Sequence, residues 1–116
     1  MTEYRLELVN KHLTINTPSG RLLIDTGSPL SFHKDASIEI CGNRYDTATN
    51  LLQADADYLT DNVGVELSGL VGMDILSRYA VLIDIPSNKI VFGYEGETEE
   101  IPSFSVIGGY AGIILD

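Results

Sequence analysis

The stretch Leu22-Leu23-Ile24-Asp25-Thr26-Gly27-Ser28 places one carboxylate directly after an aliphatic run. The aliphatic residues predict a buried strand, so Asp25 is expected at a strand end, where burial without a partner would cost several kcal/mol. The following residues supply expected hydrogen-bond partners: the hydroxyls of Thr26 and Ser28 and the backbone N–H of Gly27. Gly27 also permits a tight turn that directs Asp25 outward. The stretch therefore predicts a carboxylate that is held for proton transfer.

Two further stretches lie between this one and the end of the chain. The first is Ile38-Glu39-Ile40-Cys41-Gly42, and the second is Gly69-Leu70-Val71-Gly72-Met73-Asp74-Ile75-Leu76. The second predicts an aliphatic strand that leads into a short helix over Met73 to Tyr79. Asp74 falls in the first turn of that helix, where the helix dipole favours an anion.

Taken together, these stretches resemble the retropepsin-like aspartic proteases of retroviruses and retrotransposons. The resemblance covers about Arg21 to Phe92. It rests on Asp-Thr-Gly-Ser after aliphatic residues, and on the Leu-Val-Gly that precedes the short helix, which braces the catalytic loop in that family. Ile38 to Gly42 is similar to a strand of some retroviral proteases. The resemblance implies an all-β fold, a single-lobe retropepsin-like acid protease barrel with one short helix, in which residues 1–116 form one domain.

The chain contains one Asp-Thr-Gly, whereas aspartic proteases use two carboxylates that share one proton and activate a water. The second carboxylate must come from another copy, and a two-fold homodimer sets Asp25 against Asp25. The resemblance implies that Thr26 hydrogen-bonds across the two-fold axis. It also implies that Gly27 and Ser28 orient the carboxylate and contact the substrate. We therefore expect an aspartic endopeptidase that cleaves a polypeptide substrate, with no metal and no cofactor.

The position of a flap is left open by the sequence. Retroviral-type proteases carry a long β-hairpin flap after the catalytic loop, but only ten positions separate Ser28 from Ile38. The hairpin predicted over Ser37 to Asp46, with Gly42-Asn43 as its tight connection, could serve as the flap. The glycine-rich tail, Val106 to Ile114, is a second candidate.

In the tail, Gly108, Gly109 and Tyr110 would contact the substrate. The tail is equally well interpreted as a strand of the dimer sheet, with ordinary strand packing of Tyr110. The third alternative is that no flap exists. The protein would then be a weakly active or inactive dimerisation or peptide-binding module of the same fold.

Composition limits the partners. The 17 acidic and 7 basic residues give a formal net charge of −10, which opposes binding to nucleic acid and to anionic membrane surfaces. A single cysteine, Cys41, excludes an internal disulfide and favours a reducing compartment. No apolar run approaches the roughly 18 residues of a membrane span. No signal peptide is recognisable at the start, so a cytoplasmic location is favoured if the chain is complete.

Short strands joined by turns are predicted along most of the chain. We expect strands over Tyr4–Val9, His12–Ile15 and Arg21–Ile24, and a second hairpin over Val81–Phe92. Turns are predicted at Thr17-Pro18-Ser19-Gly20, Asp61-Asn62-Val63-Gly64 and Pro86-Ser87-Asn88. Leu51 to Tyr58 fits either a strand or a helix. An acidic loop is expected over Gly93–Glu100.

The other acidic residues and the histidines receive structural interpretations. Asp74 is interpreted as stabilising the start of its helix. Asp55 and Asp57 recur at strand spacing and are assigned to a solvated face. His12 and His33 have no spacing typical of a zinc site and are interpreted as surface or hairpin residues.

Two side chains are candidate nucleophiles by type alone. Cys41 has no evident base nearby in the sequence and is interpreted as a small buried side chain. Ser28 lacks the Gly-x-Ser-x-Gly pattern of a hydrolase nucleophile. Neither residue is expected to attack a substrate.

Overall fold

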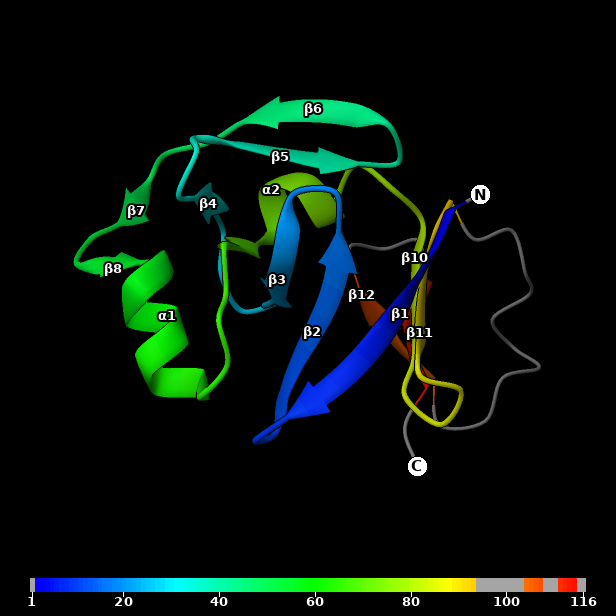
Figure 1. Cartoon of the computed structure of the whole chain (residues 1–116). Helices are drawn as coiled ribbons and strands as arrows, with labels where there is room; N and C mark the ends of the chain where they lie inside the picture. The colour runs from blue at the N-terminus through cyan, green and yellow to red at the C-terminus, as the bar shows by residue number, and fades with distance from the viewer. Residues whose placement is uncertain (1, 94–103, 108–110, 115–116) are drawn as a thin grey trace.

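The computed structural model describes residues 2–93, 104–107 and 111–114, and within them the chain is mostly β, as predicted (Figure 1). The strands are β1 (Thr2–Val9), β2 (His12–Thr17), β3 (Gly20–Ile24), β4 (Phe32–His33), β5 (Ser37–Ile40), β6 (Asn43–Asp46), β7 (Asn50–Leu51), β8 (Ala54–Asp55), β9 (Gly69–Val71), β10 (Val81–Asp84), β11 (Lys89–Phe92), β12 (Phe104–Ile107) and β13 (Ala111–Ile114). The helices are α1 (Ala56–Val63) and α2 (Met73–Leu76).

One large sheet has the strand order β12-β13-β10-β11-β1-β2-β3-β9-β4. The predicted strands near the start of the chain become β1, β2 and β3, which pair antiparallel in sequence order. β3 then pairs in parallel with β9, far along the chain, and β9 pairs with β4. The hairpins β5–β6 and β7–β8 form separate two-stranded sheets.

Two hydrophobic cores meet at β3 and β9. Alternate residues of β3 enter different cores, because Leu22 and Ile24 belong to one cluster and Leu23 to the other. β9 divides in the same way between Leu70 and Val71. Both strands are thus buried on two faces, which explains why they read as continuous aliphatic runs in the sequence.

The β5–β6 hairpin is confirmed, with a one-residue correction to its turn. The tight connection is Cys41-Gly42, with φ of 55° and 78°, and not Gly42-Asn43. Asn43 already pairs with Ile40 as the first residue of β6. Cys41 is half-buried at this turn, where its N–H donates to the Tyr4 hydroxyl, so the prediction of a buried side chain was too strong.

The helices differ from the prediction in number and length. The turn predicted over Asp61-Asn62-Val63-Gly64 is wrong, because the first three of these residues form the last turn of α1 and Gly64 ends it at φ 96°. The ambiguous stretch Leu51 to Tyr58 supplies the last residue of β7, all of β8 and the start of α1. The predicted helix over Met73 to Tyr79 is present but ends as α2 at Leu76. The described residues therefore contain two short helices, whereas the sequence predicted one.

The remaining predictions concern the second half of the chain. The Val81–Phe92 hairpin is confirmed as β10 and β11. In the tail, β13 pairs in parallel with β10 and antiparallel with β12. The acidic loop lies outside the described residues except for Gly93. Within the described part of the chain, neither helix has the length and apolar character needed to cross a membrane.

Candidate functional site

Asp25 begins a tight turn at the end of β3. Its N–H donates to Val71 O at 3.0 Å, which continues the β3–β9 pairing by one residue. The N–H of Ser28 donates to Asp25 O at 3.2 Å and closes the turn. The N–H of Gly27 donates to the carboxylate oxygen Oδ1 of Asp25 at 2.9 Å. The carboxylate is therefore oriented by the backbone of its own loop.

Only one of the three predicted partners of Asp25 contacts it. The Ser28 hydroxyl donates instead to Leu30 O at 2.7 Å. Thr26 is exposed, and within the described residues its hydroxyl makes no hydrogen bond to Asp25. Asp25 itself is half-buried, so the premise of a fully buried carboxylate was wrong. Its partial exposure lets water satisfy the oxygen that the loop does not contact.

The first residues of α2 donate backbone hydrogen bonds to the Asp25 loop. The N–H of Met73 donates to Ser28 O at 2.8 Å, and the N–H of Asp74 donates to Pro29 O at 3.2 Å. A Cβ on Gly72 would lie 2.7 Å from Ser28 O, so any larger residue would push the loop away. The first N–H groups of this helix, which lack partners within the helix, are thus satisfied by the loop.

Ser31 and Asp74 form a hydrogen-bond network that the sequence did not reveal. Asp74 Oδ2 accepts from the Ser31 N–H at 3.1 Å, and Asp74 Oδ1 accepts from the Ser31 hydroxyl at 2.5 Å. The Ser31 hydroxyl also accepts from the Gly72 N–H at 2.8 Å. Asp74 Oδ1 accepts from the Ile75 N–H as well, which agrees with the predicted role at the helix start. Asp74 also connects α2 to the segment after Asp25, through its two hydrogen bonds with Ser31.

The two candidate flaps are the β5–β6 hairpin and the glycine-rich tail. In Figure 1, β3 points away from the β5–β6 hairpin, so Asp25 lies at the opposite end of the strand from that hairpin. Near the turn of the hairpin, the Cys41 N–H donates to the Tyr4 hydroxyl and the Asn43 side-chain amide donates to the Tyr79 hydroxyl. Gly108, Gly109 and Tyr110 lie outside the described residues, between β12 and β13.

The histidines do not form a metal site in the described part of the chain, where no group of three or more metal-ligating side chains occurs. His12 is exposed, as predicted, but His33 is only 3% exposed, so its assignment to the surface was wrong. His33 Nδ1 accepts from the Asp35 N–H at 2.9 Å. Nε2 therefore carries the proton and donates to Ser19 O at 2.7 Å. Both ring nitrogens are occupied by structural hydrogen bonds.

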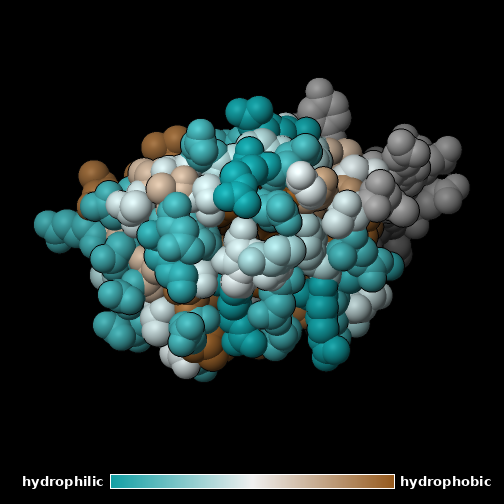
Figure 2. Space-filling model, turned by 45° about the horizontal axis from the view of Figure 1, so that its top comes forward, coloured by the Kyte–Doolittle hydropathy of each residue, from teal (hydrophilic) through white to brown (hydrophobic). Residues whose placement is uncertain are grey.

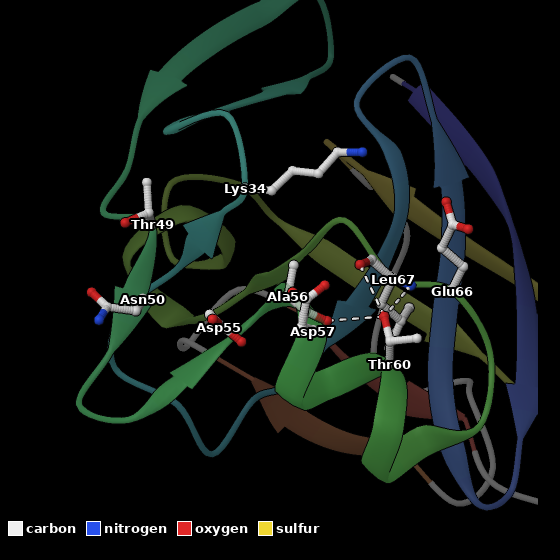
Figure 3. A pocket seen from close by; sticks show the side chains of 9 residues that line it. All are labelled: Lys34, Thr49, Asn50, Asp55, Ala56, Asp57, Thr60, Glu66 and Leu67. Carbon is white, nitrogen blue, oxygen red and sulfur yellow. Dashed lines mark hydrogen bonds between the residues drawn. The ribbon is translucent and has the colours of Figure 1, made fainter.

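Four surface cavities that are lined by described residues lie away from the Asp25 loop. Four cavities have volumes of about 350, 410, 440 and 550 Å³, and none of these four is lined by residues 25–28. The cavity of about 440 Å³ contains Asp55 and Asp57, together with Glu66 and Lys34 (Figure 3). Asp55 and Asp57 are solvent-exposed, as predicted, and Asp55 also caps α1 by accepting from the Tyr58 N–H at 2.9 Å.

Comparisons with known proteins identify no relative of this chain. A scan against models of protein families, a search of curated proteins and a search of solved structures each find no match. The chemistry of the Asp25 loop therefore has to be inferred from its own residues and contacts.

Proposed function

We propose that this protein is an aspartic endopeptidase of the retropepsin-like type, active as a homodimer. The observation that carries the proposal is the Asp25 loop. Its carboxylate is half-exposed, accepts a hydrogen bond from the Gly27 N–H, and sits at the end of a strand that pairs in parallel with the strand before α2. A carboxylate that is both oriented and accessible is what general acid–base catalysis requires.

In the proposed mechanism, Asp25 from each of two copies holds one water. Like charges about 3 Å apart cannot both ionise, so the pair retains one proton. The ionised carboxylate takes a proton from the water as the water oxygen attacks the peptide carbonyl carbon. The protonated carboxylate gives its proton to the carbonyl oxygen. Collapse of the tetrahedral intermediate then breaks the C–N bond, and the amine leaves with a proton from the pair.

The surface around Asp25 suits a site that a second copy completes. Thr26, Gly27 and Pro29 are exposed, and Leu30 exposes 50% of its surface. An apolar rim next to a single carboxylate can be covered by the same rim of another copy across a two-fold axis. In this proposal, Thr26 hydrogen-bonds to its counterpart, and Gly27 and Ser28 contact the substrate backbone.

A second candidate function is a dimerisation or peptide-binding module with little or no turnover. The specific observation in its favour is that the β5–β6 hairpin lies at the far end of β3 from Asp25 (Figure 1). Without a flap, a cleft would stay open to bulk water, and the substrate backbone would be poorly held. The tail with Gly108 to Tyr110 remains the other flap candidate in the enzyme proposal.

The deciding experiment is cleavage of an unfolded protein at mildly acidic pH, with and without a transition-state-type inhibitor of aspartic peptidases. We expect inhibitable cleavage that Asp25→Asn abolishes. The matched control is Asp46→Asn, which removes an exposed carboxylate on β6 and should leave the rate unchanged. Peptide binding without cleavage, together with no effect of the inhibitor, would instead support the module.

Mixing experiments test whether two copies share the site. A tenfold excess of Asp25→Asn chains should lower wild-type activity by about tenfold, because few wild-type chains then find a wild-type partner. Activity should also fall faster than linearly on dilution. A rate strictly proportional to enzyme concentration, unaffected by the inactive variant, would rule out the shared site.

A further inference from the structure

An apolar groove lies on the side of the molecule formed by β7, β8 and α1. Its volume is about 550 Å³, and it is lined by Leu51, Leu52, Gln53, Ala54 and Tyr58. Leu52 exposes 91% of its surface and Tyr58 exposes 52%. Figure 2 shows a face that is largely hydrophilic, with hydrophobic residues at the left margin, the side on which β7, β8 and α1 lie in Figure 1.

The Leu52 side chain packs into neither core of the protein and is almost fully exposed. It occupies the turn between β7 and β8 with φ of 58°, a conformation that costs a non-glycine residue about 1–2 kcal/mol. A glycine or asparagine would relieve the backbone strain, and a polar residue would remove the exposed apolar area. The leucine is therefore better explained by a contact outside this chain.

An acidic cavity is lined in part by residues next in sequence to those of the groove. It has a volume of about 440 Å³ and is lined by Asp55, Asp57, Glu66 and Lys34, among others (Figure 3). Three carboxylates and one ammonium give it a formal charge of −2. Sequence neighbours line the two cavities: Ala54 and Tyr58 line the groove, and Asp55 and Asp57 line the acidic cavity.

We propose that the groove and the acidic cavity together form a docking surface for a polypeptide segment of another protein. A large apolar side chain of that segment lies in the groove against Leu52 and Tyr58. A neighbouring lysine or arginine enters the cavity beside Asp57 and Glu66. The occupant is a different protein rather than a second copy, because each copy carries a formal charge of −10 and would repel another at an acidic surface.

Fluorescence anisotropy can test the apolar half of this surface. The probes are fluorescein-labelled peptides in which one leucine or phenylalanine is flanked by two arginines on each side. They are titrated into the Asp25→Asn protein, so that peptide hydrolysis plays no part. Leu52→Asn should weaken binding by about tenfold or more, as expected for one large apolar contact. Asparagine tolerates positive φ, so this variant should fold at least as well as wild type.

The matched control is Leu8→Asn, which removes an exposed leucine (59% exposed) from β1 and should leave the affinity unchanged. Tyr58→Ser, on α1, should repeat the loss seen with Leu52→Asn. A second set of variants addresses the charge. Asp57→Asn combined with Glu66→Gln should weaken binding and reduce its dependence on salt.

Three results would overturn the proposal. The first is the absence of binding by every arginine-flanked peptide, and the second is equal binding when glutamates replace the arginines. The third is a Leu52-dependent dimer of the wild-type protein in analytical ultracentrifugation, since that would make a second copy the occupant. The binding tests use Asp25→Asn, and the ultracentrifugation test measures association and not cleavage, so none of them depends on the proposed peptidase activity. Glu3→Gln removes an exposed carboxylate of β1 and serves as the charge control.

Discussion

Removing the Asp74 carboxylate should loosen the attachment of α2 to the segment after Asp25. Asp74→Ala takes away the acceptor for the N–H and hydroxyl of Ser31, which is only 4% exposed. Ser31→Ala takes away the hydroxyl that links Asp74 to the Gly72 N–H. Both changes break one network, so their effects on stability should overlap.

The magnitudes follow from the groups that lose their partners. A buried donor or acceptor left without a partner costs about 1–3 kcal/mol. Asp74→Ala leaves two such donors on Ser31, so we expect a loss of about 3 kcal/mol in the free energy of unfolding. Ser31→Ala should cost about 2 kcal/mol. The double variant should lose about 3 kcal/mol and not the sum of about 5 kcal/mol. The reason is that each single change already breaks the hydrogen bond between the Ser31 hydroxyl and Asp74.

Urea unfolding measures these losses through the transition midpoint, provided that the slope is unchanged. Asp61→Ala is the matched control: it removes an exposed carboxylate from α1 and should change stability by less than about 0.5 kcal/mol. Without urea and at saturating substrate, peptidase activity should fall in these variants only if the Asp25 loop is displaced. If the two single losses add within about 0.5 kcal/mol in the double variant, the two residues do not act as one network.

Three further outcomes are expected. Gly69→Ala should lower the free energy of unfolding by about 3 kcal/mol, because its Cβ would lie 2.5 Å from a β4 carbonyl oxygen. Gly42→Ala, with φ of 78° and open space around it, should lower it by only about 1 kcal/mol. Equal midpoints of the two variants in thermal unfolding would contradict this. Burial, followed by the hydrogen bond with a neighbouring tyrosine, raises the pKa of Tyr79 from 10.0 to about 12. The contribution of Tyr79 to the free energy of unfolding should therefore be complete below about pH 10 and be lost as the pH rises toward 12. Tyr79→Phe should flatten that loss in urea midpoints measured across this range. Cleavage should be fastest below neutral pH, because the Asp25 pair must keep one proton and two copies of charge −10 repel less in acid; a pH–rate profile that peaks above about pH 8 would exclude the shared-proton mechanism.

The helix α1 shows why part of the fold escaped prediction. Only Ala56, Leu59 and Val63 are buried, and the residues between them are mostly polar or favour other structures. The end signals were nevertheless present, since Asp55 caps the start and Gly64 ends the helix in a left-handed conformation. Weighing those two signals together would have favoured a helix over a turn.

The network around Ser31 could not be predicted from its sequence neighbours. Asp74 lies 43 positions away, and the contact exists only because β9 pairs with both β3 and β4. His33 is a similar case, because Ser19 O, its partner at Nε2, lies 14 positions earlier. Polar residues of this kind look like surface residues until the tertiary structure supplies their partners.

The sequence by itself determined the strands near the start of the chain, the hairpins β5–β6 and β10–β11, and the place of Asp25 at the end of an aliphatic run. These features depend on side-chain periodicity and on local backbone preferences, which act over a few residues. Only the tertiary structure decided that β3 lies beside β9, that α2 donates its first N–H groups to the Asp25 loop, and that Leu52 is left outside both cores. The physical reason is that such contacts depend on which distant segments share a buried surface, and no local pattern specifies that choice.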